Sequence, residues 1–278
     1  MTALEKSDGT VGKALAVLDQ IASYGRPVRF TELLGDSPLP KATLYRFVQT
    51  LNNQGMLQYD PERQTYTPGL RLVRLAHAAW AQSSLAPVAR PHLDALSHET
   101  GETVHLAQLD HAQVLYVDKR NARDPVEMFS QAGKVGPAYC TGVGKAMLAF
   151  LPEPELNTVL AQQSWHRFTA TTHVSGESLR RELADIRGEG LSFDREEHEA
   201  DIICVATPIL NSQSRPLGAL SVTGTTRRTS LDTLRDLGPR LKQAAQAIAQ
   251  DAESWLFPQT GAAAIPSQGD TPHVRSNA

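Results

Sequence analysis

Residues 41–53 read KATLYRFVQTLNN and follow the turn Ser37-Pro38-Leu39-Pro40, and this stretch decides the fold of the N-terminal part of the chain. Its apolar residues recur at intervals of three and four positions, which predicts an amphipathic helix with one inward face. These residues are Leu44, Phe47, Val48 and Leu51. Because Gly55 is a stop signal, we expect the helix to end just before it.

The outward face of the same predicted helix carries side chains that can hydrogen-bond to DNA. They are Lys41, Thr43, Tyr45, Arg46, Gln49, Thr50 and Asn53. Residues 37–59 contain two basic residues and no acidic one, so the local charge is +2. A recognition helix needs such a face, because it must reach phosphates and base edges in the major groove. A surface helix used for protein contacts is the alternative interpretation.

The segments around this helix complete a small domain. Residues 11–24 predict a first helix and residues 30–34 a short helical turn. Residues 56–59 and 64–67 predict two strands joined by a four-residue turn that contains proline. This order of elements is that of a winged helix-turn-helix. Arg63, at the tip of the hairpin, is placed to contact phosphate or a minor groove.

The rest of the chain predicts a mixed α/β body, and the fold class is α+β. The joins at residues 110–113 and 211–216 are short, which favours an antiparallel sheet flanked by helices. The predicted strands span residues 103–109, 113–119, 126–131, 191–194, 202–210 and 217–223. The predicted helices span residues 87–100, 141–150, 154–162, 177–188 and 230–255.

Five segments follow from these patterns. We expect a flexible N-terminus at residues 1–10, a winged helix-turn-helix DNA-binding domain at 11–69 and a linker helix at 70–86. Residues 87–257 would form the second domain, which we expect to bind an effector and to form oligomers. Residues 258–278 are rich in Pro, Gly, Ala and Ser, so we expect a disordered tail.

Composition limits the class of protein. The chain has 278 residues, 41% of them apolar, which fits two ordinary globular domains. The sequence predicts neither a membrane span nor a secretory signal, and two cysteines are too few for a disulfide framework, so we expect a cytoplasmic protein. The net charge of −3 argues against a large basic surface. DNA contact would therefore depend on the local charge of residues 37–59.

The sequence Thr141-Gly142-Val143-Gly144 predicts a ligand site at the start of a helix. Thr141 suits an N-cap, and the glycines let backbone N–H groups approach a carboxylate or phosphate. A phosphate-binding P-loop is excluded, because Ala146 stands where that motif has serine or threonine. A tightly packed helix start is the alternative interpretation.

Polar groups near the ends of two predicted strands could complete this site. A carboxylate at the position of Asp194 can accept hydrogen bonds from ligand hydroxyls. Ser221 and Thr223 are two residues apart, so strand alternation puts both hydroxyls on one face of the sheet. We interpret Glu196 and Glu199 as solvated loop residues.

An enzyme that acts on small acids through Cys204 or Asp194 is a second hypothesis. A cysteine nucleophile needs a nearby histidine, and His198 is close in sequence. Cys204 falls inside an apolar strand, however, where we expect a buried and inert thiol. We interpret His105 and His111 as a sheet residue and a turn residue. Because no HExxH or CxxC pattern occurs, we predict no catalytic residue, no metal site and no cofactor.

Over about residues 11–257 the chain resembles the IclR family of bacterial transcription regulators. The resemblance is carried by residues 41–47 (KATLYRF), 66–69 (YTPG), 141–146 (TGVGKA), 190–198 (GLSFDREEH), 204–208 (CVATP) and 219–224 (ALSVTG). It implies a winged helix-turn-helix, a linker helix and a GAF-like effector domain. It also implies a homodimer or a tetramer that binds double-stranded operator DNA, without a membrane, and represses or activates a catabolic operon.

The resemblance also implies an effector site. In family members with small-acid effectors the carboxylate lies at the positions of Gly142 and Val143. The positions of Met128, Asp194, Cys204, Ser221 and Thr223 complete that pocket, and Thr223 stands where serine is frequent.

Within the family the chain resembles the KdgR-like branch, which regulates sugar-acid catabolism. Residues 43–50, 102–106 and 128–130 carry this likeness. We therefore expect a repressor that responds to a small carboxylate such as a 2-keto-3-deoxy sugar acid. An aromatic acid or a short keto acid is the alternative effector.

Overall fold

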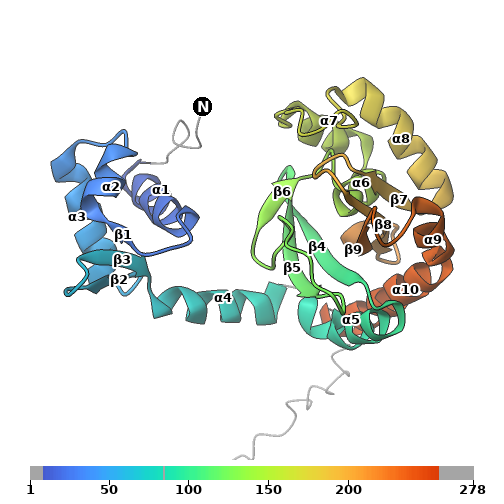
Figure 1. Ribbon diagram of the computed structural model, residues 1–278, viewed down its shortest axis with the longest axis horizontal. Helices are drawn as coiled ribbons and strands as arrows, with labels where there is room; N and C mark the ends of the chain where they lie inside the picture. Colours follow the sequence, from blue (N-terminus) through green and yellow to red (C-terminus); the bar gives the residue numbers. More distant parts are fainter. Residues whose placement is uncertain (1–8, 84, 257–278) are drawn as a thin grey trace, which may run out of the picture. The chain divides into compact units, whose positions relative to one another are not determined.

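The computed structural model describes residues 9–83 and 85–256 (Figure 1). The chain divides into two compact units, with the boundary between residues 84 and 85. Among the described residues, none of the helices is long and apolar enough to cross a membrane.

The first unit is a winged helix-turn-helix. Its elements are α1 (Gly9–Ser23), β1 (Val28–Arg29), α2 (Phe30–Gly35), α3 (Lys41–Asn53), β2 (Leu57–Asp60), β3 (Thr65–Pro68) and α4 (Leu70–Ser83). The three strands pair antiparallel in the order β1-β3-β2. The first three helices and the hairpin are confirmed within one or two residues at each end, whereas the linker helix predicted at residues 70–86 ends at Ser83. β1 was not predicted, because two residues are too few to show an alternation.

The core of this unit confirms the predicted inward face of α3. Leu44, Phe47, Val48 and Leu51 are all buried against α1 and the sheet. The α1 residues Val17, Leu18 and Ile21 are buried on the other side of the same core. Because the apolar side of α3 packs into this core, its polar side lies on the surface.

The second unit contains a six-stranded sheet between layers of helices. Its elements are α5 (Ala86–Thr100), β4 (Thr103–Asp110), β5 (Gln113–Arg120), β6 (Val135–Pro137), α6 (Gly142–Leu148), α7 (Glu153–Ala161), α8 (Gly176–Glu189), β7 (Ser192–Arg195), β8 (Ile202–Leu210), β9 (Pro216–Thr225), α9 (Leu231–Asp236) and α10 (Gly238–Leu256). The strand order is β6-β5-β4-β9-β8-β7, and every pair is antiparallel, as expected.

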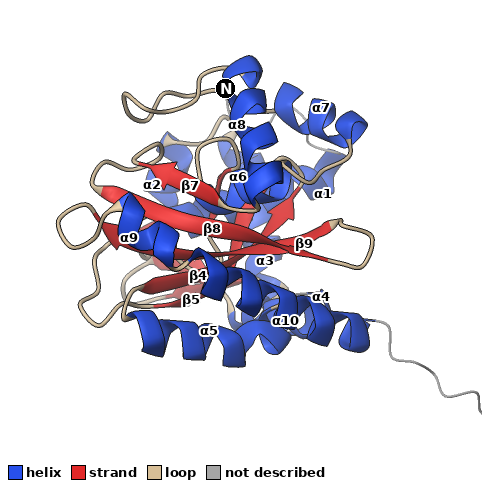
Figure 2. Cartoon of the chain, turned by 90° about the vertical axis from the view of Figure 1, so that its right-hand side faces the viewer, coloured by secondary structure: helices blue, strands red, loops and turns tan. Residues whose placement is uncertain are grey.

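Helices cover both faces of this sheet (Figure 2). α5 and α10 pack together on one face, against β4 and β8. α6 packs on the other face, against β8 and β9, and α8 lies beyond it. Every residue of α6 is buried, because the helix lies between the sheet and α8.

The predicted strand at residues 126–131 is wrong. These residues form a loop, and the strand that pairs with β5 is β6 instead. The backbone N–H of Phe129 donates to both carboxylate oxygens of Glu199, at 2.9 and 3.2 Å, and so takes no part in a sheet ladder. The apolar residues of the segment are spaced as in a strand, but the backbone N–H of Phe129 is satisfied by the Glu199 side chain.

The single helix predicted at residues 230–255 is also wrong, because it is two helices. α9 ends at Asp236 and α10 begins at Gly238, immediately before Pro239. A Cβ atom on Gly238 would lie 2.5 Å from Cδ1 of Leu191, so a larger residue there would require the Leu191 side chain to move. The proline has no backbone N–H and is tolerated in the first turn of the second helix.

Two predictions concern the ends of the chain. The flexible N-terminus predicted at residues 1–10 is wrong for Gly9 and Thr10, which begin α1. Residues 1–8 and the tail predicted at 258–278 lie outside the described residues.

Candidate functional site

The outward face of α3 presents the side chains that were predicted to contact DNA. Lys41, Tyr45, Arg46 and Thr50 are exposed, and Thr43 and Gln49 are half-buried. Arg63 lies in the turn between β2 and β3, and 78% of its side chain is exposed. Seven polar or basic side chains are therefore available on one recognition helix and the adjacent wing.

Several of these side chains already have partners inside the unit, among them Arg63, which forms an ion pair with Asp60 at 3.9 Å. The Gln49 amide lies 3.4 Å from the hydroxyl of Tyr66, and the Thr50 hydroxyl donates to the Arg46 carbonyl at 2.9 Å. These bonds orient the side chains against the helix and the wing. Lys41 and Arg46 are the charged groups that extend from the face.

The second unit encloses a small polar cavity where the start of α6 meets the sheet. It is lined by His105, Tyr116, Ser130, Thr141, Gly142, Val143, Asp194, His198, Glu199, Ile202, Cys204, Ser221 and Thr223. Six of the seven predicted effector-binding residues therefore line one cavity. The seventh, Met128, is buried in the loop 121–134 and does not line it.

Strand register explains why these residues meet. Asp194 pairs with Cys204 across β7 and β8, and Cys204 pairs with Thr223 across β8 and β9. Ser221 pairs with His105 across β9 and β4, two positions further along. Because side chains alternate between faces with a period of two, all five lie on the face that α6 covers.

The start of α6 fits closely over this row of side chains. A Cβ atom on Gly142 would lie 2.4 Å from Sγ of Cys204, so a larger residue does not fit there. Gly142 and Val143 are the first residues of the helix, and their N–H groups have no acceptor within it. These backbone donors line the cavity together with the side chains of the sheet.

The carboxyl group of Asp194 has a pKa close to neutral pH. Burial, reinforced by the charge of Glu197, raises the pKa of Asp194 to about 7. Its Oδ1 atom accepts the backbone N–H of Glu197 at 2.8 Å. A carboxyl group with this pKa can either donate a hydrogen bond to a ligand or accept one from it.

His105 is a central cavity residue that the sequence interpretation missed. Its Nε2 atom lies 2.8 Å from the Ser130 hydroxyl, and its Nδ1 atom lies 3.4 and 3.3 Å from the hydroxyls of Ser221 and Thr223. Burial, reinforced by the charge of Lys119, lowers the pKa of His105 to about 3, so the ring is neutral. His105 is indeed a sheet residue, as predicted, but its ring also connects the hydroxyl groups of the cavity.

Glu199 also differs from its interpretation as a solvated loop residue. Its side chain is 31% exposed, lines the cavity and accepts the backbone N–H of Phe129. It therefore connects the turn after β7 to the loop 121–134, two segments that form part of the cavity wall. No local pattern predicts this contact, because the two residues lie 70 positions apart in the chain.

Cys204 behaves as expected for an inert thiol. It is 6% exposed, and burial raises the pKa of its thiol to about 12. The thiolate required of a nucleophile is therefore scarce at neutral pH. The other cysteine, Cys140, is buried as well.

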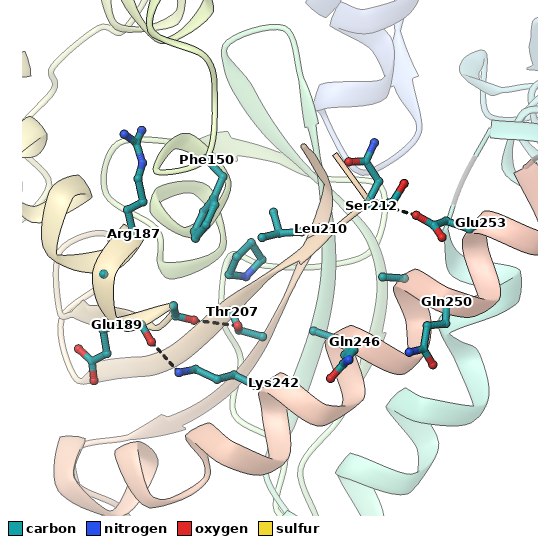
Figure 3. A pocket seen from close by; sticks show the side chains of 16 residues that line it. Phe150, Arg187, Glu189, Thr207, Leu210, Ser212, Lys242, Gln246, Gln250 and Glu253 are labelled. Carbon is teal, nitrogen blue, oxygen red and sulfur yellow. Dashed lines mark hydrogen bonds between the residues drawn. The ribbon is translucent and has the colours of Figure 1, made fainter. Parts of the chain in front are cut away.

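A larger pocket, of about 490 Å³, lies between α8, β8 and α10 (Figure 3). Some of its polar groups bond to one another: Lys242 Nζ donates to the Glu189 carbonyl at 2.6 Å, and the Ser212 N–H donates to Glu253 at 2.7 Å. None of the predicted effector residues lines this pocket. The smaller cavity under α6 is therefore the candidate effector site.

The fold and the two sites define a class of protein. A winged helix-turn-helix with a polar outward helix, followed by a domain with a polar cavity, is the arrangement of a DNA-binding transcriptional regulator that carries a sensor domain.

Comparison with known proteins identifies the family. Residues 10–61 match the IclR helix-turn-helix domain, and residues 77–250 match the domain described as bacterial transcriptional regulator IclR C-terminal. The chain belongs to the IclR family of transcriptional regulators.

Several relatives are similar over nearly their whole length. The HTH-type transcriptional regulator XynR of Escherichia coli strain K12 is 32% identical, over 87% of this chain and 96% of that protein. The HTH-type transcriptional regulator KdgR of the same strain is 30% identical, over 88% and 94%. The crystal structure of Thermotoga maritima IclR is 29% identical with a TM-score of 0.70, over 87% and 97%. The KdgR-like branch is thus one of several close matches.

Proposed function

We propose that this regulator represses a catabolic operon and responds to a small carboxylate effector, such as a 2-keto-3-deoxy sugar acid. The observation that supports this is the composition of the cavity under α6. It combines Gly142 and Val143, whose backbone N–H groups have no acceptor within α6, with the hydroxyls of Ser221 and Thr223 and the carboxyl of Asp194. A polyhydroxy acid needs both kinds of partner, donors for its carboxylate and donors or acceptors for its hydroxyls.

The size of the cavity suggests how the effector would act. The space open to water inside it is about 30 Å³, enough for only one or two water molecules. A six-carbon acid would therefore bind only after the wall opens. The contact between Glu199 and Phe129 would have to move, since it connects two parts of that wall. An effector that binds the open form better shifts the protein towards it, and so changes DNA affinity.

The same proposal includes a homodimer, or a tetramer, on a two-fold symmetric operator. What supports it is the surface of α4, where Leu70 and Val73 are 79% and 65% exposed. The two residues are three positions apart and so lie on the same side of the helix, and neighbouring exposed apolar side chains are typical of an interaction face. Two copies would then place two recognition helices on two half-sites of the operator in the cytoplasm.

A thermal-shift screen tests the effector class. We expect 2-keto-3-deoxy sugar acids to raise the melting temperature of the protein in a concentration-dependent manner, and we expect Ser221→Ala to reduce that rise. Stabilisation by aromatic acids alone would reject the sugar-acid proposal. An added gel-shift measurement shows whether the stabilising acid releases operator DNA, as a repressor requires.

A sensor of aromatic acids is the second candidate. One observation favours it: the rings of His105 and Tyr116 contact each other edge to face at 5.5 Å in the cavity wall. They could pack against an aromatic ligand. An enzyme acting through Cys204 is not proposed, because the thiol is protonated at neutral pH.

A further inference from the structure

A cluster of charged side chains lies next to the effector cavity but takes no part in the proposed function. It forms where α6, α8, the loop 163–175 and the turn after β7 meet. Its members are Lys145, His173, Glu182, Arg195 and Glu197. Lys145 is completely buried and Glu197 is 2% exposed, so the cluster extends from the interior outward to the half-buried His173.

We propose that His173, Glu182 and Glu197 bind a divalent transition-metal ion such as Zn²⁺. One ligand atom from each of the three lies within 4.8 Å of the others. His173 Nε2 is 2.5 Å from Glu182 Oε2 and 3.8 Å from Glu197 Oε2. Nitrogen and oxygen ligands of a tetrahedral zinc lie about 3.3 Å apart when the bonds are about 2.0–2.1 Å long. Each of the two distances therefore has to change by less than about 1 Å, within the reach of side-chain adjustment.

One atom of the cluster itself indicates a missing ligand. The Oε2 atom of Glu197 is buried and has no hydrogen-bond donor among the described residues. A buried carboxylate oxygen without a donor is costly, because it has lost its hydration. This atom faces His173, and a cation between the two would satisfy it.

The other polar atoms of the three residues are held in place by neighbours. Lys145 Nζ donates to Oε1 of Glu182 at 2.8 Å and to Oε1 of Glu197, and Arg195 donates to Oε1 of Glu182 at 2.9 Å. His173 Nδ1 lies 3.1 Å from the Ser178 hydroxyl. Metal sites use this kind of outer support to fix the ligands, and here the ion would replace the hydrogen bond that His173 Nε2 and Glu182 Oε2 form with each other.

The charges set the expected strength. Lys145 and Arg195 together balance the two carboxylates, so an additional divalent cation is attracted less than by an unpaired pair of acids. We therefore expect affinity in the micromolar range, below that of a dedicated structural zinc site. For the same reason Arg195→Gln should bind the ion more tightly, because it removes one positive charge.

A bound ion would stabilise one side of the effector cavity. The backbone N–H of Glu197 donates to Asp194, which lines the cavity, and the Thr172 hydroxyl donates to the Glu197 carbonyl. An ion on Glu197 would thus connect the loop 163–175 and α8 to the cavity wall. This role goes beyond the proposed response to a carboxylate and does not depend on it.

The test is a Zn²⁺ titration of the full chain, purified without a histidine tag and treated with EDTA. A chromogenic zinc chelator competes with the protein and reports the affinity. We expect one Zn²⁺ per chain and a rise in melting temperature on binding. His173→Ala and Glu182→Gln should each weaken binding by about tenfold or more, because each removes one ligand. Glu182→Gln keeps an oxygen for Lys145, and circular dichroism checks that both variants fold.

Two control variants locate the ion. His111 lies beside Asp110 at 2.7 Å on an exposed hairpin, so His111→Ala removes a matched surface pair and should leave binding unchanged. Cys204→Ser changes a possible zinc ligand in the effector cavity and should also leave binding unchanged. The proposal is overturned if Zn²⁺ shows no saturable binding in the micromolar range, if His173→Ala binds as tightly as the wild type, or if binding is lost in Cys204→Ser.

Discussion

At the scale of single residues, His105 lines the effector cavity and also makes the stability of the fold depend on pH. A buried histidine with a pKa of about 3 remains neutral in the folded protein, while the unfolded chain takes up a proton near the ordinary value of 6.5. Stability is therefore fully present above pH 6.5 and is lost as the pH falls below it.

This direction of the pH dependence gives a first prediction, for the variant His105→Asn. The wild type should lose up to about 1.4 kcal/mol of unfolding free energy for each pH unit below 6.5 on account of this residue, and the variant should lose correspondingly less. Denaturant unfolding at pH 7.5 and pH 5 measures both losses. The remaining titratable groups act in both proteins, so only the difference between them is used. Equal losses in the two proteins would show that His105 titrates normally.

Gly142 gives a second prediction, because its lack of a side chain allows α6 to reach the sheet. The Cβ of Gly142→Ala would meet Sγ of Cys204 at 2.4 Å, so we expect a loss of about 1–3 kcal/mol of stability and of the effector response. Gly188→Ala is the matched control. It lies in α8 with no atom within 4 Å of the new Cβ, and should gain up to about 1 kcal/mol. Denaturant unfolding compares the two, and equal effects would reject the close fit.

Arg46 carries a third prediction, for DNA binding. It is one of the two basic residues on the exposed face of α3, so Arg46→Ala should weaken operator binding by about 1–3 kcal/mol if the guanidinium reads a base. Arg227→Ala removes the same charge from an exposed position in the second unit and is the control. In a gel-shift titration, unchanged affinity of Arg46→Ala would exclude Arg46 from the interface.

At the scale of elements, most helices and strands could be predicted from local patterns. The short strands β1 and β6 were not predicted, and the two predicted elements that are wrong have physical causes. The strand expected at residues 126–131 is a loop because Glu199 takes its backbone N–H group. The last helix is interrupted because Gly238 and Pro239 combine a close contact with a missing donor. In both places a partner distant in sequence decided the local structure.

The exposed apolar face of α4 gives a fourth prediction. Val73→Glu places a charge beside Leu70 on the same exposed side of α4, so the proposed homodimer should weaken and operator affinity should fall with it. Analytical ultracentrifugation measures the assembly state. Val174→Glu changes an exposed valine of the second unit and serves as the control. If Val73→Glu assembles like the wild type, this face of α4 does not carry the dimer.

At the scale of the whole molecule, charge is unevenly distributed. The chain carries −3, whereas residues 37–59 carry +2. Long-range attraction of DNA to the whole protein is therefore weak. Most of the electrostatic attraction to DNA has to come from the basic side chains of α3 and the wing in each first unit.

A fifth prediction follows for the salt dependence of binding to non-operator DNA. If the three basic residues predicted to contact DNA, Lys41, Arg46 and Arg63, each reach one phosphate, a dimer makes about six phosphate contacts. A plot of log affinity against log salt should then have a slope no steeper than about −5. Fluorescence anisotropy with a labelled duplex measures it. A slope near −10 would mean that other basic groups of the chain contact the phosphates.

The sequence by itself determined the winged helix-turn-helix and the antiparallel body. It also identified six residues that line the cavity, out of seven predicted to bind the effector. These features rest on apolar periodicity, turn residues and short family motifs, which are local and therefore visible along the chain. The polar face of α3 could be predicted for the same reason, since its inward stripe fixes the outward one.

Only the tertiary structure decided which residues from distant parts of the sequence come into contact in and around the cavity. His105 meets Ser221 across 116 positions of sequence, Phe129 meets Glu199 across 70, and Lys145 meets Glu197 across 52. Sheet register and loop packing create these contacts. No spacing motif records them, because the partners share neither a helix turn nor a strand. The small volume of the cavity and the cluster around Glu197 are consequences of packing alone.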